Sequence, residues 1–357
     1  VVHVKDASRA VPVLSGLMNP DGKLAAAVKE KYERLRKEHE ASRKEKRLIP
    51  LEAARRNCFR TEVPSPAPLI SGVINSGPVK AKVLVDYIDW TFFFFSWRIS
   101  GRFPEIFDDP VRGPEARKLY DDSLWMIERI ISEDLLEIQA LSGIFPAERH
   151  GDDVKIFTGG KDDAAWFRFL RNQEEKEAGK PNYCLSDFVA EKGDHAGAFV
   201  VTVKIREELP DDFSGDDYKK IMLHILADRF AEAAAEWLHR EIRVRHWGYA
   251  PDENLPAYEL FKVKYRGIRP APGYPACPDH TGKQVIFDIL RATETIGATL
   301  TESYAMVPVS AVSGYIFASP HSVYFNVGTI GRDQLEDYAR RCAVTVEEAA
   351  RWLAPNL

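Results

Sequence analysis

The sequence predicts an α+β fold organised around an antiparallel sheet. Segments with strand-like character occur in runs and segments with helical spacing occur in other runs, whereas a parallel α/β sheet needs strict alternation. A hydrophobic content of 45% over 357 residues supports a normal folded core. The sequence shows no internal repeat. These features together predict one large globular domain or two modest ones.

The first fifty or so residues are expected to lie outside the main domain. Residues 1–4 (VVHV) suggest a short buried strand and residues 6–18 a helix rich in small side chains, but the rest of a sheet is missing. Residues 29–47 have helical spacing and high charge. This helix is interpreted as a solvated linker, although its basic excess also suits docking of an acidic partner. The compact domain is expected to begin in the proline-marked stretch 50–68.

An aromatic cluster follows at residues 86–97 (DYIDWTFFFFSW). Aromatic side chains at this density bury a large area, so their default role is in the core. Asp89 is the exception, because a carboxylate in apolar surroundings is costly unless it is paired. It is predicted either to cap the helix that follows or to meet a cationic partner.

The helices and strands of the middle region are predicted from their periodicity. Residues 115–132 form an amphipathic helix, and residues 216–243 form a long helix with Ser214 as its cap. The predicted strands are residues 150–157, 183–190 and 197–205, of which the last is the clearest. Glu232 lies at the edge of the apolar stripe of the long helix, where it is either a solvated side chain or an acid that faces a ligand.

A stiff loop, residues 269–283 (RPAPGYPACPDHTGK), precedes the C-terminal elements. Its four prolines fix φ and remove backbone donors, so it is predicted to be extended and pre-ordered, which suits rigid presentation of groups to a ligand. The elements predicted after it are a helix over 282–297 ended by Gly297, strands at 298–306, 310–318 and 322–330 with a turn at 319–321, and two closing helices, the second capped at Thr345.

Composition argues against several classes of function. A net charge of −5 gives no basic footprint for nucleic acid. The longest apolar run, residues 88–97, is far shorter than the roughly 20 residues of a membrane span, and no signal peptide is visible. The four cysteines are scattered without a CxxC pair, as expected for reduced thiols in a cytoplasmic protein. We therefore expect small molecules or proteins as partners.

The motifs of common catalytic machinery are absent from the sequence. There is no GxGxxG after a strand, no phosphate-binding GxxxxGKS or GxxxxGKT, no GxSxG and no HExxH. Cys277 and His280 could act as nucleophile and base or as two metal ligands, but a second pair of ligands is missing nearby. No catalytic residue and no metal ligand is predicted.

The remaining candidates predict a binding site. Asp89 and Glu232 could attract an ammonium or sulfonium group, and Arg269 could clamp a carboxylate in fork geometry. The aromatic faces of Tyr324 and Phe325, expected on the last strand, favour cations and flat bases. This set suits a zwitterionic, cationic small molecule, although the sequence alone does not bring these residues together in space.

Several long motifs resemble the C-terminal activation domain of cobalamin-dependent methionine synthase. They include the aromatic cluster and the stiff loop quoted above, together with YCLSDFVA, WGYAPDENL, LTESYAMVPVSAVSGYIF and RWLAPNL. The resemblance extends from about Ile49 to the C-terminus, and VVHVKDASRAV resembles the end of the cobalamin-binding domain. It implies that residues 1–20 close the cobalamin-binding domain, that residues 21–49 are a charged linker helix, and that residues 50–357 are the activation domain.

The resemblance also implies a fold and a ligand. The fold is a curved, helmet-like α+β domain around a twisted antiparallel sheet with flanking helices, and the ligand is S-adenosylmethionine, bound in a shallow groove. By position, Asp89 would hold the amino group of this ligand and Arg269 its carboxylate, while Tyr324 and Phe325 would line the groove. Ala271 would contribute backbone contacts from the stiff loop.

Three further residues receive roles from the resemblance. Glu232 matches a helix acid near S-adenosylmethionine. Tyr274 matches a loop tyrosine that faces the corrinoid, and Ala7 matches a contact to the cobalamin tail. Phe92 departs from the family, which typically has proline at this position, and this change could alter how rigidly Asp89 is presented.

The function implied by the resemblance is repair of a cofactor. Cobalamin, bound by the neighbouring domain of the same polypeptide, is occasionally oxidised to cob(II)alamin. An electron from a flavodoxin or flavodoxin-like reductase and a methyl group from S-adenosylmethionine then restore methylcobalamin. Zinc and the methionine-forming sites belong to domains of the full enzyme that this sequence lacks. The alternative is a docking module for the reductase and the cobalamin domain that has lost its ligand.

Overall fold

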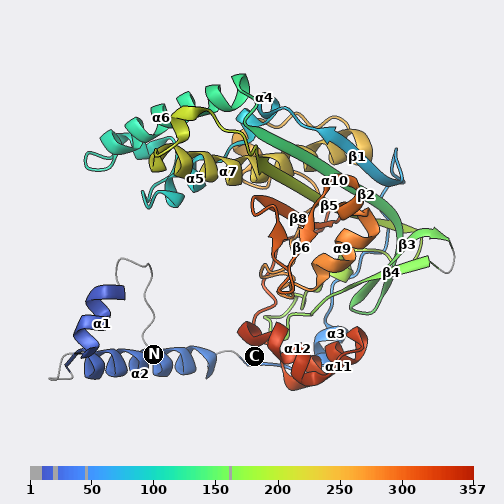
Figure 1. Ribbon diagram of the computed structural model, residues 1–357. Helices are drawn as coiled ribbons and strands as arrows, with labels where there is room; N and C mark the ends of the chain where they lie inside the picture. Colours follow the sequence, from blue (N-terminus) through green and yellow to red (C-terminus); the bar gives the residue numbers. More distant parts are fainter. Residues whose placement is uncertain (1–9, 19–22, 45–46, 161–162) are drawn as a thin grey trace.

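The computed structural model describes residues 10–18, 23–44, 47–160 and 163–357 (Figure 1). The strand predicted at residues 1–4 and the predicted contact Ala7 lie outside these residues. The two predicted N-terminal helices are present as α1 (Ala10–Met18) and α2 (Lys23–Lys44), which Figure 1 shows apart from the sheet. The charged segment is therefore helical, and its role as a linker stays a prediction.

A curled, six-stranded antiparallel sheet forms the centre of the described chain (Figure 1). Its strands are β1 (Gly72–Pro78), β2 (Leu136–His150), β3 (Asp153–Gly160), β4 (Asp163–Arg168), β5 (Asp194–Ile205) and β8 (Ala311–Ile316). Their order is β4-β3-β2-β5-β8, and β1 pairs with β2 as well. The short strands β6 (Thr299–Leu300) and β7 (Met306–Val307) form a separate hairpin. The predicted α+β fold with an antiparallel sheet is confirmed.

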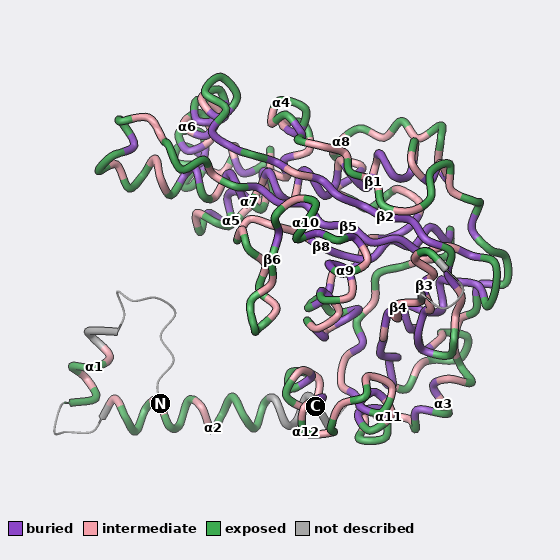
Figure 2. Tube along the Cα trace, turned by 45° about the vertical axis from the view of Figure 1, so that its right-hand side comes forward, coloured by how far each residue is buried: buried purple, intermediate pink, exposed green. Residues whose placement is uncertain are grey.

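Helices cover both faces of this sheet, so β2 and β5 are buried along most of their length (Figure 2). The first face carries α4 (Ala81–Leu84), α5 (Trp90–Ser96), α6 (Gly113–Ser132) and α7 (Asp217–Glu241), and the second carries α9 (Gly282–Leu290) and α10 (Ala292–Ile296). Alternate residues of β5 serve the two cores: Phe199 and Val201 contact the first, whereas Ala198 and Val200 contact the second. A strand packed on both faces needs apolar residues throughout, which explains the strong signal of residues 197–205.

A third core lies at the C-terminal end, where α11 (Arg332–Cys342) packs against α12 (Val346–Trp352). Thr345 Oγ1 accepts a hydrogen bond from Glu348 N at 3.1 Å, which confirms the predicted cap. The short helix α3 (Leu51–Arg56) is tied to α11 by a hydrogen bond, since Leu51 N donates to Asp333 Oδ2 at 2.7 Å. The remaining short helices are α8 (Ala257–Leu260), η2 (Val85–Tyr87), η3 (Glu105–Asp108), η4 (Leu185–Phe188), η5 (Asp211–Phe213), η6 (Ile242–His246) and η7 (Ala354–Asn356).

Three strand predictions are wrong. Residues 183–190 contain the 3-10 helix η4, because the Asp187 carboxylate accepts from Cys184 N at 2.9 Å and closes the turn. Residues 322–330 leave the sheet and run beside the stiff loop, where Val327 N donates to Pro275 O at 2.9 Å. Residues 298–306 do not form one strand, since they fold into the hairpin of β6 and β7.

Two helix predictions also need correction. The helix predicted over 282–297 is divided at Arg291, whose φ of 52° is left-handed, so α9 ends there and α10 runs on to Gly297. The cap of α7 is Asp216 and not Ser214, since Asp216 Oδ1 accepts from Lys219 N at 3.0 Å. The helix predicted over 115–132 is confirmed within α6.

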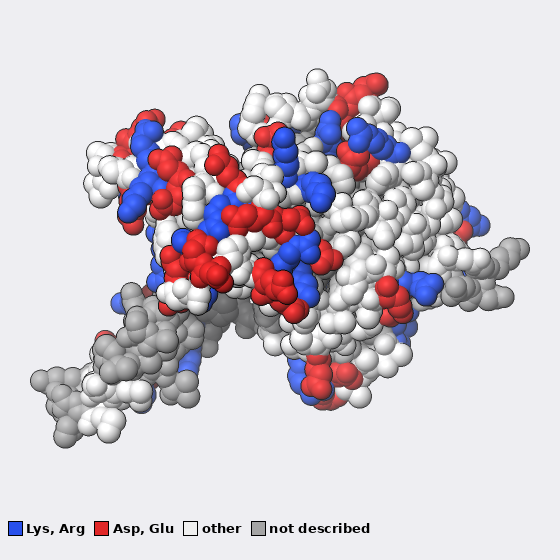
Figure 3. Space-filling model, turned by 45° about the horizontal axis from the view of Figure 1, so that its top comes forward, with Lys and Arg blue, Asp and Glu red and all other residues white. Residues whose placement is uncertain are grey.

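Acidic and basic side chains are interspersed on the face shown in Figure 3. A cluster of ion pairs joins α6 to the segment before α7 and to its start: Arg129 pairs with Glu133 and Asp212, and Lys219 pairs with the same Asp212. Within the described ranges, no helix combines the length and the apolar character needed to cross a membrane.

Candidate functional site

A cavity of about 560 Å³ lies between α7, the start of α5, the stiff loop and the irregular segment after β8. Small-molecule sites typically measure roughly 300–1,000 Å³, so the size suits a ligand. Its walls include every residue predicted to bind the ligand, namely Asp89, Glu232, Arg269, Ala271, Tyr324 and Phe325, and also the predicted corrinoid-facing Tyr274. The fold therefore brings together candidates from separate segments of the chain.

Asp89 begins α5, and its position is compatible with both roles considered from the sequence. Its Oδ1 accepts a hydrogen bond from Thr91 N at 2.9 Å and so caps the helix. The residue is only half-buried and lines the cavity, which leaves it available to a cation. Phe93 and Phe94 behind it are buried as predicted, whereas Phe92 is exposed and forms part of the cavity wall.

Arg269 is held from two sides. Its backbone N–H donates to Tyr324 Oη at 3.0 Å, and its guanidinium Nη2 donates to Glu236 Oε2 at 2.7 Å. Burial by itself lowers the pKa of Arg269, but the carboxylate of Glu236 more than offsets this, so the pKa is raised above its ordinary value. Arg269 is therefore a fixed cation in the cavity wall.

A second buried ion pair, Arg243 with Glu253, lies next to Glu236. Arg243 donates to Glu253 in fork geometry, from Nε at 2.6 Å and from Nη2 at 2.7 Å, and its guanidinium carbon lies 4.1 Å from the centroid of the Tyr265 ring. Arg243 Nη1 lies 3.9 Å from Glu236 Oε1. Glu236 thus sits between one guanidinium in the cavity wall and another in the interior.

His239 is buried in the same region of α7. Its Nε2 lies 3.3 Å from Tyr249 Oη, and its ring meets the Tyr265 ring edge to face. Burial, together with the charges of Arg243 and Arg269, lowers the pKa of His239 well below its ordinary value. His239 is therefore neutral at physiological pH, and it packs behind the cavity wall against Tyr265.

The stiff loop is ordered by its own backbone, but it is folded into tight turns and is not extended as the sequence predicts. Tyr274 N donates to Ala271 O at 3.1 Å, Cys277 N donates to Tyr274 O at 2.9 Å, and Gly273 N donates to Cys277 O at 2.8 Å. Gly273 has a φ of 97°, and a Cβ at this position would collide with the His280 ring, so the loop needs glycine here. Tyr274 stands at the cavity rim with 60% of its surface exposed.

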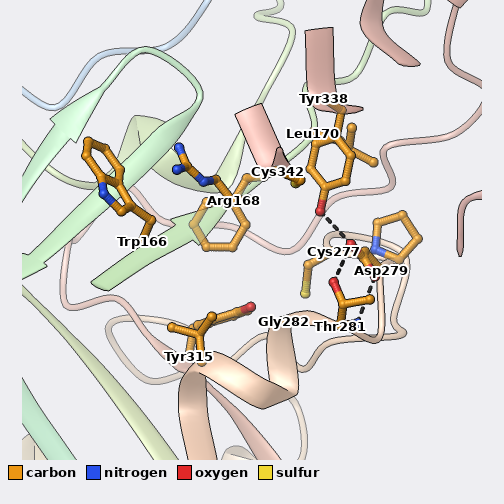
Figure 4. Close-up of a pocket in the computed structure, with 13 residues that line it drawn as sticks. Trp166, Arg168, Leu170, Cys277, Asp279, Thr281, Gly282, Tyr315, Tyr338 and Cys342 are labelled. Carbon is orange, nitrogen blue, oxygen red and sulfur yellow. Dashed lines mark hydrogen bonds between the residues drawn. The ribbon is translucent and has the colours of Figure 1, made fainter. Parts of the chain in front are cut away.

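Cys277 and His280 do not form a nucleophile and its base. The buried Cys277 Sγ donates to Ala271 O at 3.0 Å, and burial raises the pKa of this thiol, which disfavours the reactive thiolate. His280 Nδ1 lies 3.0 Å from Lys283 Nζ instead. Figure 4 shows Cys277 beside a separate cavity of only about 60 Å³. Among the described residues, no group of three His, Cys, Asp or Glu side chains could hold a metal ion.

Sequence reasoning missed several residues of the cavity, of which Glu236, Arg229 and Tyr265 matter most. Glu236 follows Glu232 by four positions, and Arg229 precedes Glu232 by three. Helical spacing could therefore have placed Arg229, Glu232 and Glu236 on one face of α7. Tyr265 belongs to a loop after α8 that no motif distinguishes. The sequence contains no signal that pairs Glu236 with Arg269, because they lie on different elements.

Comparisons with known proteins show to which family the chain belongs. Residues 80–343 match the family described as vitamin B12 dependent methionine synthase, activation domain. A crystal structure of the MetH reactivation domain bound to AdoHcy is similar to this chain, with 46% sequence identity and a TM-score of 0.81. The match covers 87% of this chain and 98% of that one. On this basis the chain belongs to the family of vitamin B12 dependent methionine synthase activation domains.

Proposed function

We propose that the cavity binds S-adenosylmethionine and that the domain presents the methyl group of this ligand for reductive methylation of cob(II)alamin to methylcobalamin. The observation that carries the proposal is the convergence of carboxylates, guanidinium groups and aromatic rings in one cavity. The related MetH structure is bound to AdoHcy, which is S-adenosylmethionine without its transferable methyl group. The methylated cobalamin would again support homocysteine methylation.

The charge of the cavity supports this ligand. Its walls carry three carboxylates, from Asp89, Glu232 and Glu236, and two guanidinium groups, from Arg229 and Arg269, which leaves a net charge of −1. S-adenosylmethionine has one carboxylate, one ammonium and one sulfonium group, and therefore a net charge of +1. Complementary charge favours both recognition and the rate of encounter.

Each part of the ligand has a matching group. Arg269 would bind the carboxylate and Asp89 the amino group, while Glu232 would add negative charge near the cationic end. Tyr324 and Phe325 would form the aromatic wall, as residues of an irregular segment and not of the strand expected from the sequence. The backbone of Ala271 would supply polar contacts, since the loop that carries it is already ordered.

The domain would act by placing the methyl group. A sulfonium methyl is already activated towards nucleophiles, so no side chain needs to serve as acid or base, and the contribution is proximity. Cobalamin would be held by the preceding domain of the same polypeptide, of which residues 1–20 are the end, and residues 21–49 would be the linker. Tyr274, exposed at the cavity rim, would face the corrinoid. A flavodoxin or flavodoxin-like reductase of the cytoplasm would supply the electron.

Calorimetric titration of the chain with S-adenosylmethionine tests this proposal. We expect saturable binding, with affinity reduced about 100-fold in Arg269→Ala and at least about 10-fold in Asp89→Ala, since each loses hydrogen bonds to a charged group. Absence of binding by the unsubstituted chain would reject the proposal. Binding of a flavodoxin that persists in both variants, without S-adenosylmethionine binding to the unsubstituted chain, would instead favour the docking module.

A further inference from the structure

Within the group formed by Glu236, Arg269 and Arg243, three buried polar atoms have no hydrogen-bond partner among the described residues. They are Glu236 Oε1, Arg269 Nε and Arg243 Nη1. A buried polar group without a partner costs stability, and such groups are uncommon unless a ligand or water completes them. Because Glu236 and Arg269 both line the cavity, the unpartnered atoms point to a ligand group that binds at this place.

Glu236 is fixed more firmly than the other acids of the cavity. Only 5% of its surface is exposed, whereas Asp89 and Glu232 are half-buried. It lies between Arg269, at 2.7 Å, and Arg243, at 3.9 Å. Arg243 cannot turn towards the cavity, because Glu253 holds it in a fork. This arrangement orients Glu236 from behind, so that it can orient Arg269.

The effect on Arg269 is directional. The bond from Nη2 to Glu236 Oε2 fixes the plane of the guanidinium group, and the bond from its backbone N–H to Tyr324 Oη fixes the start of the side chain. The buried Nε has no hydrogen-bond partner among the residues that the structure describes. A planar guanidinium held in this way offers its remaining donors in one orientation, which is what fork recognition of a carboxylate requires.

We infer that Glu236 is a positioning residue for the ligand carboxylate: it acts on the ligand through Arg269 and makes the site selective for a ligand that keeps its carboxylate. This inference rests on the proposed function. Two other roles of Glu236 predict different results. If Glu236 contacted the ligand ammonium directly, it would not distinguish ligands with and without the carboxylate. If it only neutralised Arg269, its removal would strengthen carboxylate binding.

The test compares S-adenosylmethionine with decarboxylated S-adenosylmethionine. Calorimetry gives the dissociation constant of each ligand. The constant of the decarboxylated ligand divided by that of S-adenosylmethionine is a ratio that measures the contribution of the carboxylate. We expect Glu236→Gln to reduce this ratio about 10-fold, because a charge-assisted bond that orients Arg269 is weakened. Glu236→Met, of similar size but without an acceptor, should reduce it at least as far. In an Arg269→Lys background, Glu236→Gln should change the ratio no further, since the residue it acts through has gone.

The matched control is Glu241→Gln. Glu241 is also a buried glutamate of α7 paired with an arginine, Arg245, but it does not line the cavity, so the ratio should stay unchanged. An unchanged or increased ratio in folded Glu236→Gln and Glu236→Met would overturn the inference and leave the proposed function standing. Failure of the unsubstituted chain to bind either ligand would reject the proposed function itself.

Discussion

Arg171, which is buried, and Arg269, which is partly buried, differ in how completely their donors are used. Arg171 ties η4 to the turn between β2 and β3: it donates to Asp152 from Nε, to Asp187 from both Nη atoms and to the Asn182 carbonyl. Arg269 in the cavity donates only to Glu236 from its side chain, and its buried Nε has no partner in the described chain. A saturated arginine has no donor left for a ligand, whereas Arg269 combines an unsatisfied donor with a place in the cavity wall, and this combination suits recognition.

The strongest way to test this contrast is to remove Arg171. Arg171→Met should lower the free energy of unfolding by about 3–5 kcal/mol, because Asp152 and Asp187 are left buried without their counter-ion. Urea unfolding measures this loss. Arg245→Met is a control, since Arg245 is 68% exposed beside Glu241 and should cost less than about 1 kcal/mol. A loss as small as that of the control would mean that the Arg171 cluster is not a stabilising unit.

Acidification should lower the free energy of unfolding first through His239, near the cavity, and only later through the cluster of Arg171, Asp152 and Asp187. The folded pKa of His239 lies well below its ordinary value of 6.5, so the unfolded chain binds more protons below pH 6.5 and stability falls as the pH drops through this region. One such histidine contributes a slope of up to about 1.4 kcal/mol per pH unit. In the cluster, burial by itself raises the pKa of Asp152, but the charges of Arg171 and Arg55 outweigh burial and lower this pKa. The contribution of Asp152 is therefore present above pH 3.8 and lost only below it, whereas burial raises the pKa of Asp187.

Urea unfolding at pH values between about 7.5 and 5 tests this order, because it measures how the free energy of unfolding changes with pH in the range where His239 contributes. His239→Gln should show a shallower fall in stability below pH 6.5 than the unsubstituted chain. Some slope should remain, because burial also lowers the pKa of His195 and of His246. Equal pH slopes of the free energy of unfolding in the two proteins would show that His239 is not the group that makes the stability sensitive to acid.

The smallest effect separates the two roles of Asp89. Asp89→Asn keeps an oxygen that can cap α5, so stability should change little, whereas Asp89→Ala should lose about 1 kcal/mol. Both variants lose the negative charge and should bind S-adenosylmethionine more weakly. Thermal unfolding and calorimetry on the same samples measure the two quantities. Full affinity in the asparagine variant would make Asp89 a helix cap only.

Local chemistry explains which elements the sequence pattern predicts. The strand at 197–205 and the cap at Thr345 follow from neighbouring residues alone. The longest strand, β2, was not recognised because Gly143 and Pro146 interrupt its pattern. The packing around Gly143 leaves no room for a side chain, since a Cβ there would lie 2.6 Å from the Phe145 ring of the same strand and 2.7 Å from Leu290 Cδ2 of α9. A pattern that depends on a distant helix cannot be seen in a local window.

For the binding site, too, some features follow from the sequence and others only from the tertiary structure. The sequence by itself determined the α+β class, the stiffness of the proline loop and the residue types that a zwitterionic cation needs, because these depend on periodicity and side-chain chemistry. Only the tertiary structure decided that Glu236 pairs with Arg269, and that Tyr324 and Phe325 reach the cavity from an irregular segment. These contacts depend on distances between segments that are far apart in the chain, and such distances are set by packing across the whole domain.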